Sequence, residues 1–349
     1  MRSCQCPRRD YTLFLEDPKV VAVQVICYDF SKAFDKLGHN VIIKRLLDCN
    51  IPSLLINWVA DYLNGRLQHV RVGNHISNGS LVTSGVPQGS VIGPFLFAMV
   101  TGSFAPLDPS SVRSVIYGDD FYLMIAIYMS SLNEHVKMEH NNLVHWSNNQ
   151  KLNLNFNKCK SLCVSSFQTR GFSGIPLPGI DFVTSHKILG VIFNESLSWN
   201  SHIDYITSLA AKRLYALRVL RPVLSDSELR LVYTSLIRSL LEYACPVFIG
   251  LNSQLSDQIN KIQIRAHRIF CSNPACSVSM QCIPDLSSRR NTLSSKLMCR
   301  ILADKSHILH SLAPVVGSLG RRFILAHCKS TRRLKSFFPC TTIIVNSNL

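Results

Sequence analysis

The sequence predicts an α+β protein, with helices and strands mixed in the first part of the chain and helices alone in the second. Two observations predict this class. Up to about residue 206, apolar β-branched runs alternate with segments of helical periodicity. From His202 onward, the apolar residues recur mainly at helical spacing. This order of elements favours two domains that divide near residue 206.

Two stretches give the clearest strand signals. Val20–Tyr28 is a nearly continuous apolar run, which is typical of a strand buried on both faces, and it ends at Asp29. Val112–Tyr117 and Phe121–Tyr128 are separated only by Gly118-Asp119-Asp120, which predicts a tight hairpin with acids at its tip. Further strand predictions are a hairpin of Gln68–Val72 and His75–Val82 around Gly73–Asn74, a strand pair within Lys151–Ser166, and one strand at Lys187–Phe193.

Helical spacing predicts two helices early in the chain. One covers His39–Cys49, and the next is opened by Pro52 and stopped by Asn64–Gly65. Trp58 and Tyr62 share a spacing in the second helix that favours the helix core over a base-stacking platform.

The later helices carry both capping signals and basic residues. Ser225 and Glu228 form a capping box at the start of a helix. The apolar face predicted for it is Leu229, Val232, Leu236 and Leu240. The helix predicted at Ser253–Phe270 turns Leu255, Ile259, Ile262, Ala266 and Ile269 inward.

The composition favours a polyanionic partner. In the 349 residues, 37 Lys and Arg minus 21 Asp and Glu give a formal net charge of +16. Each cation placed on a phosphate releases counterions, so this excess suits nucleic acid. The 13 cysteines have no regular spacing, and no apolar run approaches the roughly 18 residues of a membrane span. We therefore expect an intracellular protein of the nucleus and cytoplasm, with no membrane partner; the sequence leaves its oligomeric state open.

Asp29, Asp119 and Asp120 stand at strand ends in an otherwise basic chain. Clustered carboxylates repel one another unless a cation or proton neutralises them, and hard oxygen ligands suit Mg²⁺. If the strands are neighbours, their ends suit two metal ions about 4 Å apart, a geometry that serves phosphoryl transfer. The alternative is a turn-forming Asp pair and a helix-capping Asp.

Three sequence motifs follow one another along the chain: two contain these acids, and the one between them is rich in glycine. They are Tyr28–Asp35, Ser84–Pro94 and Tyr117–Asp120, and they resemble the first three palm motifs of non-LTR (LINE-type) retrotransposon reverse transcriptases. The second is the most specific, because eleven residues with two prolines and three glycines match. Leu152–Cys159 resembles the fourth motif, Ile188–Phe193 resembles the primer grip, and the resemblance extends to Ser336–Pro339.

The resemblance implies a right-hand polymerase palm, an antiparallel sheet with packed helices, followed by an all-helical thumb. It assigns residues 1–206 to the palm with remnant fingers and primer grip, 207–270 to the thumb, and 271–349 to a C-terminal region. The implied function is RNA-directed DNA polymerisation with two Mg²⁺ ions, or Mn²⁺ in their place. The implied partners are an RNA template, a DNA primer and dNTPs, and the primer 3′-OH is the nucleophile.

The roles are carried over residue by residue. Asp29, Asp119 and Asp120 are the expected catalytic acids, and these acids and the Phe30 carbonyl are the expected metal ligands. The expected nucleotide-binding residues are Lys32, Ala33, Phe34, Gln88, Gly89 and Lys158. Phe34 matches the position that blocks a ribose 2′-OH, and Lys158 a lysine that protonates pyrophosphate, with a plain surface lysine as the alternative. The expected nucleic-acid contacts are Lys212, Arg213, Arg218, Lys261, Arg265 and Arg268, with an ordinary solvated face as the alternative.

The sequence departs from the family pattern at three places. Gly118 replaces the usual Ala, Thr101-Gly102 replaces the usual Asn-Asp pair, and the chain starts close to Asp29 without fingers or endonuclease. We therefore expect an N-terminally truncated copy with intact acids. A catalytically inactive nucleic-acid-binding relic is the alternative function, whereas the context of Ala33–Asp35 disfavours a group II intron maturase. His267, Cys271, Cys276 and Cys282 lack the close cysteine pair typical of zinc sites.

Overall fold

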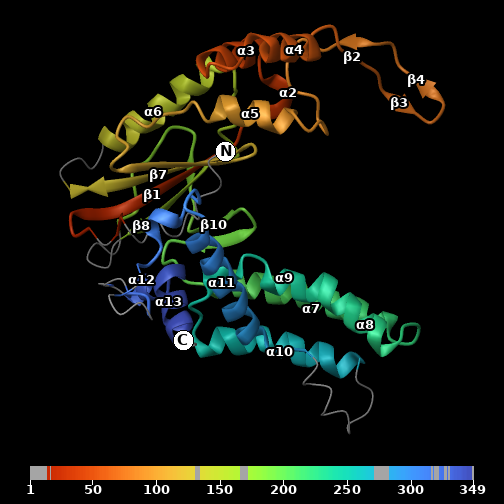
Figure 1. The fold of residues 1–349 in the computed structure, drawn as a ribbon, viewed down its shortest axis with the longest axis vertical. Coiled ribbons are helices and arrows are strands. Elements are labelled where there is room, and N and C mark those ends of the chain that lie inside the picture. The colour runs from red at the N-terminus through yellow and green to blue at the C-terminus, as the bar shows by residue number, and fades with distance from the viewer. Residues whose placement is uncertain are drawn as a thin grey trace. The chain divides into compact units, whose positions relative to one another are not determined.

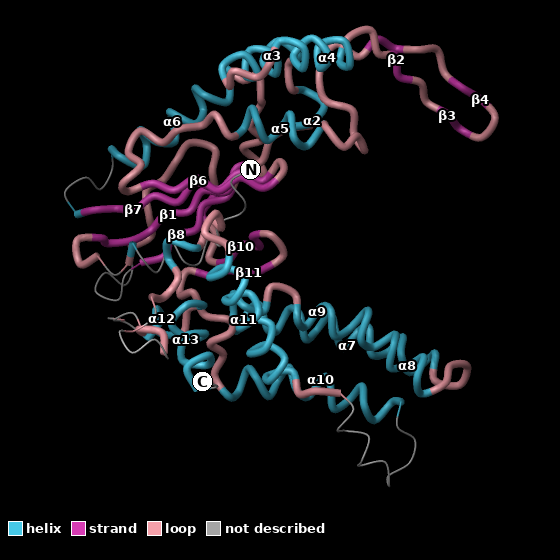
Figure 2. Tube along the Cα trace, viewed as in Figure 1, coloured by secondary structure: helices cyan, strands magenta, loops and turns pink. Residues whose placement is uncertain are grey.

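The computed structural model divides the chain into two compact units. The described residues are 14–15, 17–129, 134–165, 172–270, 283–315, 317, 322–325, 328 and 331–347. Within them, the N-terminal unit is Pro18–Val183, and the C-terminal unit begins at Thr184 and also contains the residues before Pro18 (Figures 1 and 2). The division after residue 206 names functional domains rather than compact units, so it stays a prediction.

A five-stranded sheet forms the base of the N-terminal unit, in the order β6-β7-β1-β8-β9. The strands are β1 (Val20–Tyr28), β6 (Val112–Tyr117), β7 (Asp120–Tyr128), β8 (Lys160–Ser165) and β9 (Asp181–Phe182). Neighbours are antiparallel except for the parallel pair β8–β9. All nine residues of β1 are buried, which confirms the prediction of a strand covered on both faces.

Helices cover one face of this sheet, as Figure 1 shows. They are the short α2 (Ala33–Lys36), α3 (His39–Asp48), α4 (Ser53–Leu63), α5 (Gly93–Thr101) and α6 (Glu134–Asn149). One apolar core joins them to the strands, with Ile26 and Leu123 from the sheet and Ile42, Leu96 and Leu143 from the helices. Removing these side chains from water holds the unit together. An antiparallel sheet with packed helices is therefore confirmed.

A protruding arm, residues 66–82, follows α4 and extends away from the sheet (Figure 2). It consists of two short ladders, β2 (Leu67–Gln68) with β5 (Ser80–Leu81) and β3 (Arg71–Val72) with β4 (His75–Ile76). The chain reverses at Gly73–Asn74, as predicted.

The C-terminal unit starts with a hairpin, β10 (Ser185–Ile188) and β11 (Val191–Asn194), and is mostly helical afterwards. Its helices are α7 (Asn200–Leu220), α8 (Asp226–Val232), α9 (Ser239–Glu242), α10 (Ser253–Phe270), α11 (Leu286–Ala303), α12 (Thr331–Leu334) and α13 (Phe337–Ser347). A π-helical segment, Tyr233–Arg238, joins α8 to α9; short 3₁₀ turns lie at Cys245–Phe248 and His310–Leu312. The capping box of Ser225 and Glu228 is confirmed.

Two strand predictions are wrong in part. Lys151–Ser166 contains one strand, β8, instead of a pair; the residues before it form turns whose apolar side chains, such as Leu152, are buried. Alternation of apolar residues therefore did not distinguish a docked loop from a strand. Lys187–Phe193 is a hairpin rather than one strand, because Leu189 and Gly190 both have positive φ and reverse the chain.

Two predicted helix faces also need correction. In α4 the buried residues are Ile56, Val59 and Leu63, while Trp58 is 55% exposed, because this helix is apolar almost all round and its spacing does not fix one face. The helix after Ser225 buries Leu229 as predicted, but then Tyr233, Ile237 and Leu241 instead of Val232, Leu236 and Leu240. The π-helical segment has more residues per turn, so its buried positions recur at every fourth residue. In α10, Phe270 rather than Ile269 is buried.

Candidate active site

Asp29 is the first residue after β1 and is fixed through its backbone. Its carbonyl accepts a hydrogen bond from the Asn155 N–H at 2.8 Å, and its own N–H donates to the Cys159 Sγ at 3.5 Å. The carboxylate is 36% exposed. The strand therefore holds Asp29 with its acid group accessible to solvent.

The β6–β7 turn places two more acids at the same end of the sheet. Tyr117 pairs with Asp120 across the turn, and Gly118 and Asp119 form its tip. In the antiparallel pair of β1 and β7, Tyr28 is opposite Phe121, so the register continues to Asp29 beside Asp120. The structure thus brings together two strand ends that are far apart in the sequence.

Phe30 lies next to this end with its ring in the core. It forms an isolated bridge with Leu154, in which the hydrogen bonds are made by its neighbours Asp29 and Ser31. In such a non-hydrogen-bonded pair, the N–H and C=O of Phe30 itself point to the opposite side of the strand. That side is the one on which β7 lies. The Phe30 carbonyl is therefore directed toward the strand that carries the other acids.

The glycine-rich second motif docks on α2 through the backbone. The Val86 N–H donates to the Phe34 carbonyl at 2.8 Å, and the Gly85 N–H donates to the Leu37 carbonyl at 2.7 Å. Gly85 has φ +85°, and a Cβ there would lie 2.5 Å from the Asp35 carbonyl oxygen. Only glycine permits this close crossing.

This docking places Phe34 and Gln88 in the same region. The Phe34 ring packs on Phe97 with centroids 4.5 Å apart, and the Gln88 Nε2 donates to Asp35 Oδ1 at 2.8 Å. Gln88 and Gly89 are exposed, and so is Lys32, which has a φ of +51° at the start of α2. Ala33, in contrast, is buried and presents only backbone.

Lys158 lies close to the first acid. Its Nζ is 3.8 Å from Asp29 Oδ2, and its side chain is 68% exposed. At this exposure the pair adds little stability, because water and salt screen it. The contact does show that the ammonium of Lys158 reaches the carboxylate of Asp29.

Two buried thiols, those of Cys27 and Cys159, lie near the end of β1. Burial raises the pKa of Cys27, and the charge of the Asp120 carboxylate raises it further. Burial also raises the pKa of Cys159, with a further contribution from the Asp29 charge. Both thiols therefore stay protonated at neutral pH and are poor nucleophiles.

The acids suit a divalent cation by their chemistry. Among the described residues, no group of three or more His, Cys, Asp or Glu side chains is gathered so as to hold a metal ion. The candidate ligands Asp29, Phe30, Asp119 and Asp120 offer only carboxylate and carbonyl oxygens, the ligands that Mg²⁺ prefers. Asp119 and Asp120 are exposed, as is part of Asp29. The ligand types and their accessibility fit such an ion.

The predicted nucleic-acid contacts belong to the C-terminal unit. Lys261, Arg265 and Arg268 are exposed on α10, opposite its buried face. On α7, Lys212 and Arg218 point about 120° apart at about 100° per residue, so they do not share one face. Arg213 donates to the Leu236 carbonyl. The α10 series is thus the only continuous basic face among these six described residues.

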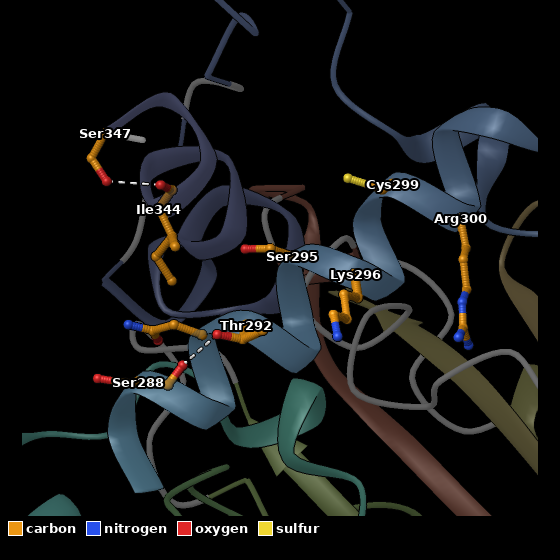
Figure 3. Close-up of a pocket in the computed structure, with 9 residues that line it drawn as sticks. Ser288, Thr292, Ser295, Lys296, Cys299, Arg300, Ile344 and Ser347 are labelled. Atoms are coloured by element: carbon orange, nitrogen blue, oxygen red, sulfur yellow. Dashed lines mark hydrogen bonds between the residues drawn. The ribbon is translucent and has the colours of Figure 1, made fainter. Parts of the chain in front are cut away.

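A hollow between α11 and the end of α13 is a rival site on the C-terminal unit (Figure 3). It is lined by Ser288, Asn291, Thr292, Ser295, Lys296, Cys299, Arg300, Ile344 and Ser347. No carboxylate is among these lining residues, and none of them is a predicted site residue. The hollow therefore lacks the ligands expected for metal-dependent chemistry. Three of the four residues considered as a zinc site, Cys271, Cys276 and Cys282, lie outside the described residues.

Sequence reasoning missed three residues that shape the site. Asp35 holds Gln88, the His39 Nε2 bonds the Gly85 carbonyl at 2.9 Å, and Cys159 anchors Asp29. Asp35 and Cys159 lie inside the motifs, so proximity to the matched acids was a usable signal. His39 follows the first motif by four residues, so a similar signal was available for it.

Comparison with known proteins gives the class to which this fold and this set of acids correspond. A family described as "Reverse transcriptase (RNA-dependent DNA polymerase)" matches residues 17–193, about half of the chain. The chain belongs to this family. The α+β fold, a right-hand polymerase palm followed by helices, is therefore confirmed. Members of the family generally use divalent metal ions.

Proteins similar to this chain include polymerases of mobile elements from Drosophila melanogaster. The "RNA-directed DNA polymerase from mobile element jockey" is 26% identical over 340 residues, covering 89% of this chain and 35% of the relative. The "Probable RNA-directed DNA polymerase from transposon BS" is 26% identical over 264 residues, covering 71% and 28%. The chain thus spans about a third of the length of these relatives.

Solved structures of telomerase from Candida tropicalis are also similar. The complex with a telomeric RNA fragment has a TM-score of 0.41 at 10% identity, covering 78% of this chain and 42% of that one. The apo structure has a TM-score of 0.40 at 10% identity, covering 89% and 56%. Within the described part of the protein, no helix is both long and apolar enough to cross a bilayer.

Proposed function

We propose that the N-terminal unit is the catalytic core of a non-LTR retrotransposon polymerase that adds deoxynucleotides to a primer on an RNA template. One observation carries the proposal: Tyr28 of β1 lies opposite Phe121 of β7, so Asp29 and Asp120, the next residues at these strand ends, share one end of the sheet. A turn-forming Asp pair and an unrelated capping Asp would have no reason to share that end. The family membership supports the same reaction.

The reaction is a phosphoryl transfer. The primer 3′-OH attacks the α-phosphorus of a dNTP, the new P–O bond forms, and the bond to pyrophosphate breaks. Asp29, Asp119 and Asp120, with the Phe30 carbonyl, would hold the divalent cations. When bound, such ions lower the pKa of the attacking hydroxyl and offset the charge that develops on the phosphate.

The residues around α2 would receive the nucleotide. Phe34, held against Phe97, would exclude a ribose 2′-OH by steric contact, and the backbone of Lys32 and Ala33 would face the triphosphate. Gln88 and Gly89 would support the nucleotide and the template base. Lys158 reaches the acid end of β1, where its ammonium would donate a proton to the departing pyrophosphate.

The C-terminal helices would hold the duplex product. Residues 207–270 would serve as a thumb, and the α10 face of Lys261, Arg265 and Arg268 would contact phosphates. These three cations are exposed, so they can pair with phosphates without any change in the packing of the core. Work on an RNA template and a nicked DNA primer would place the protein in the cytoplasm and nucleus.

Primer extension tests the proposal. The protein is given an RNA template, an annealed DNA primer and dNTPs with Mg²⁺, and the product length is measured. Asp119→Asn keeps the size of the side chain but removes its charge, so we expect extension to fall at least about a hundredfold. Binding of the template–primer should stay within about twofold, because Asp119 is not a phosphate contact.

A nucleic-acid-binding relic is the second candidate. It is favoured by the Lys158 ammonium near Asp29 and by the open arrangement of the described acids. Wild-type protein that binds the template–primer with salt-sensitive affinity but never extends it would establish the relic. Extension that survives in Asp119→Asn would contradict the assignment of the acids.

A further inference from the structure

Two stacked aromatic rings and a guanidinium lie on the surface of the N-terminal unit. Trp58 and Tyr62, one turn apart on α4, stack with centroids 5.9 Å apart and planes 14° from parallel. The Arg66 Cζ lies 5.0 Å from the Tyr62 ring centroid, and Arg66 Nη1 donates to the Tyr62 carbonyl. Through these contacts the three flat groups follow one another as a row from α4 to residue 66, where the arm begins. Figure 1 shows the arm continuing from α4.

Of the three groups, Tyr62 packs partly against the apolar core of the unit, whereas Trp58 lies mostly outside it. The residues that bury α4 are Ile56, Val59 and Leu63, whereas Trp58 is 55% exposed. Leaving a tryptophan in water forgoes a large gain from burial, since its side chain is among the largest apolar groups. The exposed ring of Trp58 already stacks on Tyr62, so it favours a partner that stacks on its other face.

The charges around the row favour an anionic partner. Asp61 is the only acidic residue between Ser53 and Leu107, while Arg66 and Arg71 are cations of the arm. Arg66 has no carboxylate partner among the described residues. Aromatic rings supply stacking for bases, and a nearby guanidinium supplies a contact for phosphate.

We propose that Trp58, Tyr62 and Arg66 form a stacking platform for single-stranded nucleic acid, seating an unpaired base on the exposed face of Trp58. Every base has a flat π-face, so the platform binds without strong sequence preference. Arg66 and Arg71 then contact the backbone phosphates that flank the base. The proposal rests on the proposed function only for the identity of the strand, which would be the single-stranded RNA template outside the duplex.

Tryptophan fluorescence gives a direct test with the full chain. The protein has three tryptophans; Trp199 is buried and Trp146 packs against Phe121, so Trp58 is the most exposed. An unlabelled single-stranded RNA of about 12 nucleotides, within the site size of such surfaces, is titrated into the protein. We expect the emission of Trp58 to be quenched as the RNA binds.

Three variants separate stacking from mere exposure. Trp58→Phe should lose the quenching but keep the affinity within about threefold, because a ring remains, whereas Trp58→Ala should bind about tenfold more weakly, as loss of one stacked base predicts. Affinity is measured by anisotropy of a labelled RNA. Leu54→Ala, on the same helix and 78% exposed, is the matched control and should bind like wild type. Unchanged circular dichroism would show that each variant is folded.

Two results would overturn the platform. One is equal RNA affinity in Trp58→Ala and wild type, with no quenching of Trp58. The other is self-association of wild type that Trp58→Ala abolishes while RNA affinity stays unchanged, which would make the row a protein-docking surface. Quenching by RNA in a protein that never extends a primer would leave the platform intact and remove only the polymerase proposal.

Discussion

Asp29 is held in the site by a residue far from it in the sequence, since its N–H donates to the Cys159 Sγ. Asp29, Asp119, Phe34 and Gln88 were found because they sit inside motifs whose spacing matches a family. The bonds that hold them were not visible. Cys159 reaches the Asp29 N–H across 130 residues, and such a partner follows from the strand order rather than from local pattern.

His202 gives a prediction for the stability of the C-terminal unit. It is 1% exposed, and its Nε2 has no hydrogen-bond partner in the described structure. Burial lowers its pKa to about 4, and the nearby charge of Lys187 acts in the same direction. The unfolded chain takes up a proton near the ordinary pKa of 6.5, whereas the folded chain resists it, so acid favours unfolding.

We expect the free energy of unfolding to fall by about 2 kcal/mol between about pH 7 and about pH 5 from this group, with the loss complete near pH 4. Urea unfolding of the C-terminal unit at each pH measures it. His202→Phe, which suits the neighbouring rings of Trp199 and Phe248, should remove this contribution. A variant with the same pH dependence as wild type would contradict the assignment.

At the scale of elements, long apolar runs were predictable and docked loops were not. The sequence predicts β1 and the β6–β7 hairpin clearly, because a buried strand needs continuous apolar, β-branched residues. The loop from Lys151 to Cys159 alternates apolar and polar residues as a half-buried strand does, but it packs beside the end of β1 instead of forming a strand there. The exposed face of α4 was missed because its apolar residues surround the helix.

Two glycines of the site loops should respond differently to alanine. Gly85 crosses α2 so closely that a Cβ would lie 2.5 Å from a backbone oxygen, and backbone cannot move aside as a side chain can. Gly118, at φ +59°, has nothing within 4 Å of a Cβ. We expect Gly85→Ala to cost at least about 3 kcal/mol and Gly118→Ala only about 1–2 kcal/mol, the ordinary cost of the left-handed region.

Chemical unfolding of both variants measures the difference in the N-terminal unit. Primer extension provides a second readout, since only Gly85→Ala should displace Phe34 and Gln88. Equal destabilisation by the two substitutions would mean that the second motif does not rest on α2 as the backbone bonds indicate.

At the scale of the whole molecule, the charge favours one kind of partner but does not locate the surface that would bind it. The net charge of +16 favours nucleic acid, yet the six basic residues chosen from spacing do not all form one surface. Arg213 bonds the backbone of the π-helical segment, which no periodicity in the sequence indicates. The α10 face remains as the series that matches helical geometry.

Salt dependence tests that face. Replacing Lys261, Arg265 and Arg268 together by Gln should lower the slope of log affinity against log salt by about 3 for a duplex template–primer, since each lost phosphate contact contributes about 0.9. Lys137→Gln, an exposed cation of α6, is the control for charge alone and should barely change the slope. An unchanged slope in the triple variant would move the phosphate contacts elsewhere.

The central position of β1 bears on how the acids come together. Its backbone amides are locked in ladders to β7 and β8, so exchange of these hydrogens with deuterium should require opening of the sheet itself. Asp29 thus directly follows a strand that is paired on both sides, whereas Asp119 lies in an exposed two-residue turn. We therefore expect the amides of β1 next to Asp29 to exchange more slowly than those of the turn that carries Asp119.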